Sequence, residues 1–179
     1  MRASERRLRT TMRGRGFARA ALLAVLVAAT GCGDDGDGGA FAVALTLRDG
    51  AGQAATTFAL GAPITLELSV QNRSDRTRIL TFGSSQTFEF QVFAQESEAP
   101  LWTWSRGGIF TPVIQSMSFE PGEVRTFTAV WDQVADDGAA VGAGTLEARG
   151  FLTVLVGPHV DLPENRHAAG VRRVAFATG

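Results

Sequence analysis

Alternating hydrophobic and polar residues dominate the chain from Phe41 onwards and predict β-strands. In residues 41–48, 64–71 and 87–92, apolar side chains occupy every second position, with polar or small residues between them. This alternation is typical of a strand with one buried and one wet face. In 87–92 we therefore expect Phe88 and Phe90 to be buried and Glu89 to face water. Further strands are expected near 77–82, 100–105, 113–119, 124–132, 145–156 and 171–177.

Turn signals rich in Gly, Pro, Asp and Asn separate these segments. They occur at 49–50, 72–75, 120–123, 136–138 and 142–144. Pro121-Gly122 suits the centre of a type II turn, because Gly tolerates the positive φ required there. About eight or nine short strands of this kind predict an all-β fold, an antiparallel immunoglobulin-like β-sandwich.

Residues 1–31 have a different character. Seven of them are Arg and one is acidic, and they include a run of ten apolar residues at 20–29. Ten residues are too few to span a bilayer, which takes roughly 20, but they suit the apolar region of a signal peptide. The next residues, Thr30-Gly31-Cys32, resemble the lipobox of bacterial lipoproteins. That resemblance implies cleavage between Gly31 and Cys32 and lipidation of the Cys32 thiol.

These features predict three regions. Residues 1–31 are a lipoprotein signal peptide, whose translation starts at either Met1 or Met12. Residues 32–40 are the lipidated Cys and a Gly/Asp-rich flexible tether, and residues 41–179 are the β-sandwich domain. We therefore expect an exported protein, anchored by lipid at Cys32 to the inner or outer membrane of the bacterial cell envelope, with its domain in the periplasm or at the surface.

Charge and composition narrow the function classes. The chain has a formal net charge of −1, but its Arg-rich first 31 residues leave the remainder clearly acidic. An acidic body repels nucleic acid, so no nucleic-acid partner is expected. No catalytic set, small-molecule substrate, cofactor or metal is predicted either. The late cluster His159, Asp161, Glu164 and His167 has the ligand types of a zinc site without a known ligand spacing.

Several runs occur in an order and spacing that resemble one family. They are residues 70–74, 82–92, 101–110, 119–132 and 136–146, and they resemble the intracellular proteinase inhibitor (BsuPI) domain family. The resemblance implies a sandwich domain and, for the founding type of member, inhibition of a serine proteinase. The residues that carry it, to which we assign a structural role, are Gln86, Phe88, Phe90, Trp102, Trp104, Ser105, Phe110, Pro121, Gly122, Trp131, Gly138 and Gly144.

We therefore expect a non-enzymatic protein that binds another protein. The specific activity that the family resemblance implies is inhibition of a serine proteinase. The alternative is a structural or assembly module of the envelope with no inhibitory activity. Arg106 precedes the adaptable pair Gly107-Gly108, so we hypothesise that it is the specificity residue of an inhibitory loop. Trp102 and Trp104 lie two residues apart, on one face of a strand. We expect at least one indole to be largely buried against Phe or Trp from other strands, the alternative being an aromatic binding surface.

Overall fold

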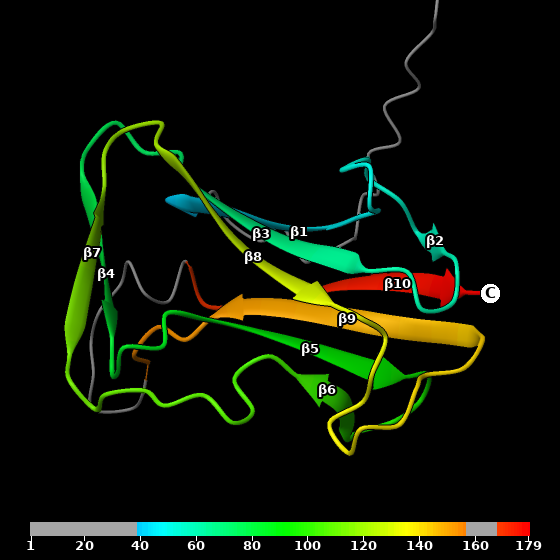
Figure 1. The fold of residues 1–179 in the computed structure, drawn as a ribbon. Helices are drawn as coiled ribbons and strands as arrows, with labels where there is room; N and C mark the ends of the chain where they lie inside the picture. Colours follow the sequence, from blue (N-terminus) through cyan, green and yellow to red (C-terminus); the bar gives the residue numbers. More distant parts are fainter. Residues whose placement is uncertain (1–38, 157–167) are drawn as a thin grey trace, which may run out of the picture. The chain divides into compact units, whose positions relative to one another are not determined.

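The computed structural model describes residues 39–156 and 168–179, and these form ten named strands (Figure 1). The strands are β1 Phe41–Arg48, β2 Thr57–Phe58, β3 Ile64–Asn72, β4 Arg78–Phe82, β5 Phe88–Ala94, β6 Pro100–Thr103, β7 Gln115–Phe119, β8 Val124–Trp131, β9 Gly144–Leu152 and β10 Arg172–Thr178.

The strands form three sheets. One has the order β1-β3-β8, the second β2-β10-β9-β5-β6, and the third is the pair β4-β7. Neighbouring strands are antiparallel, except for a two-residue parallel pairing of β2 with β10. The predicted all-β, antiparallel sandwich is therefore confirmed. Each expected strand segment has a counterpart, and β2 is additional because two residues are too few to show alternation.

The core lies between the three-stranded and five-stranded sheets. In β3, the central strand of its sheet, every second side chain is buried: Ile64, Leu66, Leu68 and Val70. Strand β9 provides Leu146, Ala148 and Leu152 from the opposite sheet. This is the period-2 burial that the sequence pattern predicts, with the outward residues of β3 left partly in water.

Specific contacts join the sheets at their edges. Strand β1 lies beside β10, where the Arg172 side chain donates a hydrogen bond from Nε to the Val43 carbonyl at 2.8 Å. The β4–β7 pair is joined to the same core by an edge-on contact of Phe119 with Phe41, whose ring centroids are 5.3 Å apart. Residues 39–156 and 168–179 contain no helix able to cross a membrane.

Buried Asn72 joins the end of β3 to the turn between β7 and β8. Its amide nitrogen donates to the carbonyls of Arg76, Phe119 and Glu120, and its side-chain oxygen accepts from the backbone and hydroxyl of Ser74. A buried amide with its donors and acceptor satisfied stabilises the turn it bridges. The segment 72–75, predicted as a turn from composition, is therefore organised by one side chain.

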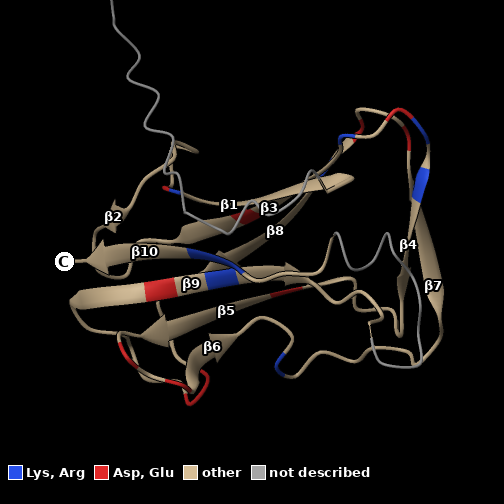
Figure 2. Cartoon of the chain, turned by 180° about the vertical axis from the view of Figure 1, so that it is seen from behind, with Lys and Arg blue, Asp and Glu red and all other residues tan. Residues whose placement is uncertain are grey.

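Several charged side chains on the outer surface pair with partners of opposite sign. Figure 2 shows acidic and basic segments next to each other along β9, where Glu147 pairs with Arg149. Across β1 and β3, Arg48 binds Glu67 through two hydrogen bonds of 2.9 and 2.6 Å. This bidentate pairing lowers the pKa of Glu67 below its ordinary value, chiefly through the hydrogen bond from Arg48.

The lowered pKa of Glu67 predicts a pH-dependent contribution to stability. A carboxyl whose folded-state pKa is depressed contributes fully above its unfolded pKa, about 4.3, and the contribution is lost as pH falls through the lower folded value. Because both side chains remain partly in water, we expect about 0.5–1 kcal/mol. Urea denaturation of wild type and Arg48→Gln should differ by this amount at pH 7 and converge at about pH 3. A difference that persists at pH 3 would contradict this assignment.

Candidate functional site

The two tryptophans that follow Pro100 pack against the core. Trp102 lies opposite Val92 of β5, and its ring centroid is 6.1 Å from that of Trp131. Trp104 stacks on Phe88, with ring centroids 4.3 Å apart. Both indoles are partly buried, so each forms part of the core wall and keeps one portion at the surface.

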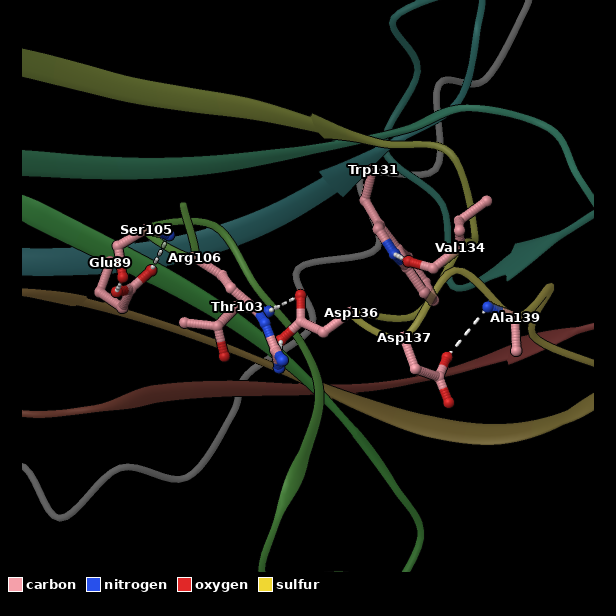
Figure 3. Close-up of polar contacts among 9 residues, drawn as sticks. All are labelled: Glu89, Thr103, Ser105, Arg106, Trp131, Val134, Asp136, Asp137 and Ala139. Carbon is pink, nitrogen blue, oxygen red and sulfur yellow. Dashed lines mark hydrogen bonds and ion pairs between the residues drawn. The ribbon is translucent and has the colours of Figure 1, made fainter. Parts of the chain in front are cut away.

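A buried carboxylate holds the chain directly after β6. Glu89, expected on the wet face of its strand, is only 5% exposed, and that expectation is wrong. Its oxygens accept hydrogen bonds from the backbone and hydroxyl of Ser105 (Figure 3). They also accept from the Gln86 side chain at 2.9 Å and from the Phe90 backbone at 2.9 Å. Ser105 therefore covers Glu89 on the outer side of β5. The alternation of residues within β5 cannot predict this, because Ser105 comes from a different segment of the chain.

Arg106 is tied to a second turn. Its guanidinium lies 3.2 Å from the Asp136 carboxylate, which also accepts the backbone N–H of Thr103 at 3.3 Å (Figure 3). The backbone N–H of Asp136 in turn donates to the Leu101 carbonyl at 2.8 Å. The Arg106 side chain is 66% exposed, but its charged end already has a partner from the turn that follows β8.

The β6–β7 loop, residues 104–114, turns sharply and then runs without regular structure to β7. Gly107 has a φ of 78°, which a side chain would disfavour, and the Gly108 N–H donates to the Ser105 carbonyl at 2.9 Å. A Cβ at position 108 would lie 2.7 Å from the Phe110 ring, so glycine there lets that ring pack onto the backbone. Phe110 also contacts Trp104, at 5.9 Å between ring centroids.

The far half of the loop is held by the segment before β5. The Thr111 N–H donates to Ser85 Oγ at 2.8 Å, and the Ser85 N–H donates back to the Thr111 carbonyl at 2.9 Å. Between and beyond these attachments, the loop exposes three β-branched apolar side chains. Ile109 is 97% exposed, Ile114 71% and Val113 53%. The β6–β7 loop is thus both attached and strongly apolar at its surface.

A groove of about 410 Å³ lies beside the start of this loop. Its lining includes Trp102, Trp104, Trp131, Val130, Arg106 and Asp136. Strand β8 borders the groove and pairs only with β3 among the described strands. The groove and the β6–β7 loop form one continuous surface, because Trp104 and Arg106 belong to both.

The remaining signature residues lie in turns and at strand ends. Pro121 and Gly122 form the turn between β7 and β8, where Gly122 has a φ of 75° and the Glu123 N–H donates to the Glu120 carbonyl at 3.0 Å. Gly138 has a φ of 86° in the turn after β8, and Gly144 opens β9. The turn of Pro121 and Gly122 lies outside the β6–β7 loop, whereas Gly138 belongs to the turn whose Asp136 pairs with Arg106.

Buried Gln133 is a structural residue that the sequence pattern did not identify. Its side chain donates to the carbonyls of Ala59 and Ala62 at 2.7 and 2.8 Å, and its φ is 58°. It thus joins the turn after β8 to the segment before β3. The signal in the sequence is weak, because a polar residue between Trp131 and a Gly-rich turn is ordinarily exposed.

Several predicted features fall outside the described residues. They are the signal peptide, the cleavage position at Gly31, the lipidated Cys32 and most of the tether, together with the cluster from His159 to His167. Within 39–156 and 168–179, no group of three or more His, Cys, Asp or Glu side chains is arranged to hold a metal ion.

Comparisons with solved structures find distant likenesses to parts of larger proteins. A β-glucosidase from Erythrobacter marinus is 14% identical, with a TM-score of 0.42, and the match covers 79% of this chain and 16% of that one. The alkylpurine DNA glycosylase AlkC of Pseudomonas fluorescens is 8% identical, with a TM-score of 0.42, covering 80% of this chain and 31% of that one. This chain therefore spans less than a third of either protein.

No curated protein matches the chain. A family model does match, over residues 53–155, and its description is "Intracellular proteinase inhibitor", BsuPI. The match covers β2 to the end of β9, including the β6–β7 loop and all the signature residues. It confirms the resemblance drawn from those residues, and a proteinase inhibitor is a binding protein, which agrees with the expected non-enzymatic character.

The same match corrects the predicted location. Export and lipid anchoring at the cell envelope conflict with a family described as intracellular, so that prediction is wrong. It rested on the Arg-rich start of the chain, the apolar run at 20–29 and the short motif Thr30-Gly31-Cys32, and matches to short motifs carry a risk of false positives. The family match rests instead on the whole pattern of strands and turns over 53–155.

The fold and the family match over residues 53–155 indicate the same family. Most of the signature aromatics line the core of one sandwich, Gly122 and Gly138 lie in its turns, and the matched segment spans more than half of the chain. This chain belongs to the intracellular proteinase inhibitor family, BsuPI.

Proposed function

We propose that this chain inhibits a serine proteinase by inserting its β6–β7 loop into the active-site cleft of the enzyme. Family membership supplies the activity class. The observation that carries the proposal is the loop itself, which combines an exposed apolar surface with attachment at both ends to the sandwich.

Attachment favours inhibition for an energetic reason. A loop that is already held in one conformation loses less conformational entropy on binding than a free one, so more of its contact energy appears as affinity. Here Ser105 is held by Glu89, and Thr111 is held by Ser85 through two hydrogen bonds. The segment between them is therefore presented by a rigid scaffold, as binding loops commonly are.

The composition and the backbone of the loop also suit binding in a proteinase cleft. Within 107–114 the described chain contains no charged residue, and its backbone does not belong to a strand or helix. An irregular segment with unpaired backbone groups can pair with the extended binding cleft of a proteinase. The adjoining groove provides further contact area through the partly exposed indoles of Trp102 and Trp104.

The test is inhibition by the purified full chain. We expect it to slow at least one of trypsin, chymotrypsin, elastase and subtilisin at a near-stoichiometric ratio, and to remain intact by mass spectrometry after incubation. If the chain slows none of the four enzymes, the proposal is contradicted. Rapid degradation of the chain would contradict it equally, because an inhibitor must outlast the complex.

A second outcome would identify the alternative function. A structural or assembly module would be recovered with a cellular partner by crosslinking while leaving every proteinase at full rate. Among the strands that the structure describes, β8 pairs along one edge only, and this eight-residue strand is charged only at Arg125. This edge favours the alternative, since unpaired edges accept further strands.

A further inference from the structure

We propose that Ile109 is the residue that enters the specificity pocket of the proteinase, so that the target enzyme has an apolar pocket. This inference rests on the proposed inhibition and names the class of its target. The side chain of Ile109 is 97% exposed, the largest exposure among the exposed large apolar residues of the described chain. It therefore has essentially its whole surface available to a partner.

Both neighbours of Ile109 are held in place while its side chain is not. On one side, the Gly108 N–H donates to the Ser105 carbonyl at 2.9 Å. On the other side, Phe110 packs on Trp104 and on the backbone of Gly108. A single side chain projecting between two attachments is the arrangement that binding into a pocket needs, because the backbone on each side is already positioned.

Support on the far side extends one residue further. Thr111 exchanges two hydrogen bonds with Ser85, at 2.8 and 2.9 Å, directly before β5. The chain from Gly108 to Thr111 is consequently braced at three of its four residues, and only Ile109 lacks a side-chain or backbone contact in this set. The loop thus singles out one position.

Arg106, the residue expected from sequence, is arranged differently. Its guanidinium is paired with Asp136 at 3.2 Å, and its backbone N–H closes a turn with the Thr103 carbonyl at 3.0 Å. Entry into a carboxylate-bottomed pocket would require the guanidinium to leave Asp136 and the turn to open. Ile109 requires neither change, so the geometry favours the apolar residue.

The chemistry of Ile109 identifies the kind of pocket. Proteinases with an aspartate at the base of the pocket select basic side chains, whereas those with an apolar slot or a small apolar pocket select hydrophobic ones. A β-branched aliphatic side chain suits the apolar kind. Enzymes of the elastase, chymotrypsin and subtilisin types are therefore the expected targets, and an enzyme of the trypsin type is not.

Two single variants of the full chain separate the possibilities: Ile109→Asp at the proposed position, and Arg106→Gln at the residue expected from sequence. Leu60→Asp is the matched control, because Leu60 is 50% exposed in the turn between β2 and β3, outside the β6–β7 loop and the groove. Burying an Ile side chain in a pocket is worth enough that Ile109→Asp should raise the inhibition constant by about a hundredfold or more against elastase, chymotrypsin or subtilisin. Leu60→Asp should change it less than about threefold, and Arg106→Gln should raise it far less than Ile109→Asp does. Because Ile109 and Leu60 are exposed, thermal unfolding of Ile109→Asp and Leu60→Asp should match wild type.

The outcomes distinguish this inference from the function on which it rests. Wild type that inhibits an apolar-pocket enzyme and loses inhibition only through Ile109→Asp supports the inference. Inhibition that survives Ile109→Asp, or that is confined to trypsin and lost through Arg106→Gln, overturns the inference and leaves the proposed function standing. Wild type that inhibits none of the enzymes overturns the proposed function, and the inference with it.

Discussion

Replacing Trp131 with alanine is expected to lower the free energy of unfolding by about 3–5 kcal/mol. The side chain is 2% exposed and is the largest of the fully buried side chains in the described chain. Its ring comes from β8, yet it lies 6.1 Å from Trp102 of β6 and 6.2 Å from Phe176 of β10. Truncation would therefore open a cavity at the junction of both sheets.

The indole also has a polar role. Its Nε1–H donates to the Val134 carbonyl at 2.8 Å, which holds the first residues of the turn after β8 (Figure 3). Trp131→Phe would keep part of the apolar volume but leave that carbonyl without its donor. We therefore expect its free energy of unfolding to lie between those of wild type and Trp131→Ala.

Urea denaturation followed by circular dichroism measures these losses. The control is Val130→Thr, because Val130 is the neighbouring residue on β8, is 58% exposed and is replaced by another β-branched residue. Its effect should stay within about 0.5 kcal/mol. A loss of less than about 1 kcal/mol for Trp131→Ala would show that the two sheets do not depend on this ring as the contacts indicate.

The sequence predicts the strands well where burial follows the strand period. In β3 the apolar positions from Ile64 to Val70 are all on the inner face, so the pattern and the burial coincide. The two-residue β2 has no period to detect, and its pairing with β10 depends on residues more than a hundred positions later. Local alternation therefore identifies strands that pack as whole faces, and it misses pairings made by a few residues.

The candidate site was predicted less completely, because long-range polar contacts define it. Ser105 bonds to Glu89, 16 positions away in the sequence, and Arg106 bonds to Asp136, 30 positions away. Neither contact can be predicted from the local composition of the chain. The Gly pair at 107–108 correctly indicated an exposed turn near Arg106. The residue left most exposed, Ile109, depends on where Phe110 packs, which only the folded loop reveals.

Replacing Glu89 with alanine is expected to destabilise the fold by about 2–4 kcal/mol and to weaken inhibition. The carboxylate accepts from two groups of Ser105 and from the Gln86 amide, and these donors would remain at a largely covered position without an acceptor. Hydrogen bonds to a charged group are the stronger kind, so their loss exceeds that of a neutral pair.

The effect on inhibition follows from the place of Ser105 at the base of the β6–β7 loop. Without Glu89 the loop would sample more conformations, and binding would have to restrict them. We expect the inhibition constant to rise by about three- to tenfold under conditions where the variant is still fully folded. Glu89 acts here as a positioning residue, since its carboxylate is buried and does not reach the surface that a proteinase would contact.

Three matched variants isolate this role. Ser105→Ala removes only the hydroxyl donor and should cost less than Glu89→Ala, and Glu89→Gln should lie between wild type and Glu89→Ala because it keeps one acceptor oxygen. Glu98→Gln, at an exposed position between β5 and β6, should change neither unfolding nor inhibition. If Glu89→Ala unfolds like wild type, the carboxylate does not hold the loop. If it is destabilised but inhibits like wild type, the loop keeps its binding conformation through Phe110 and Thr111 alone.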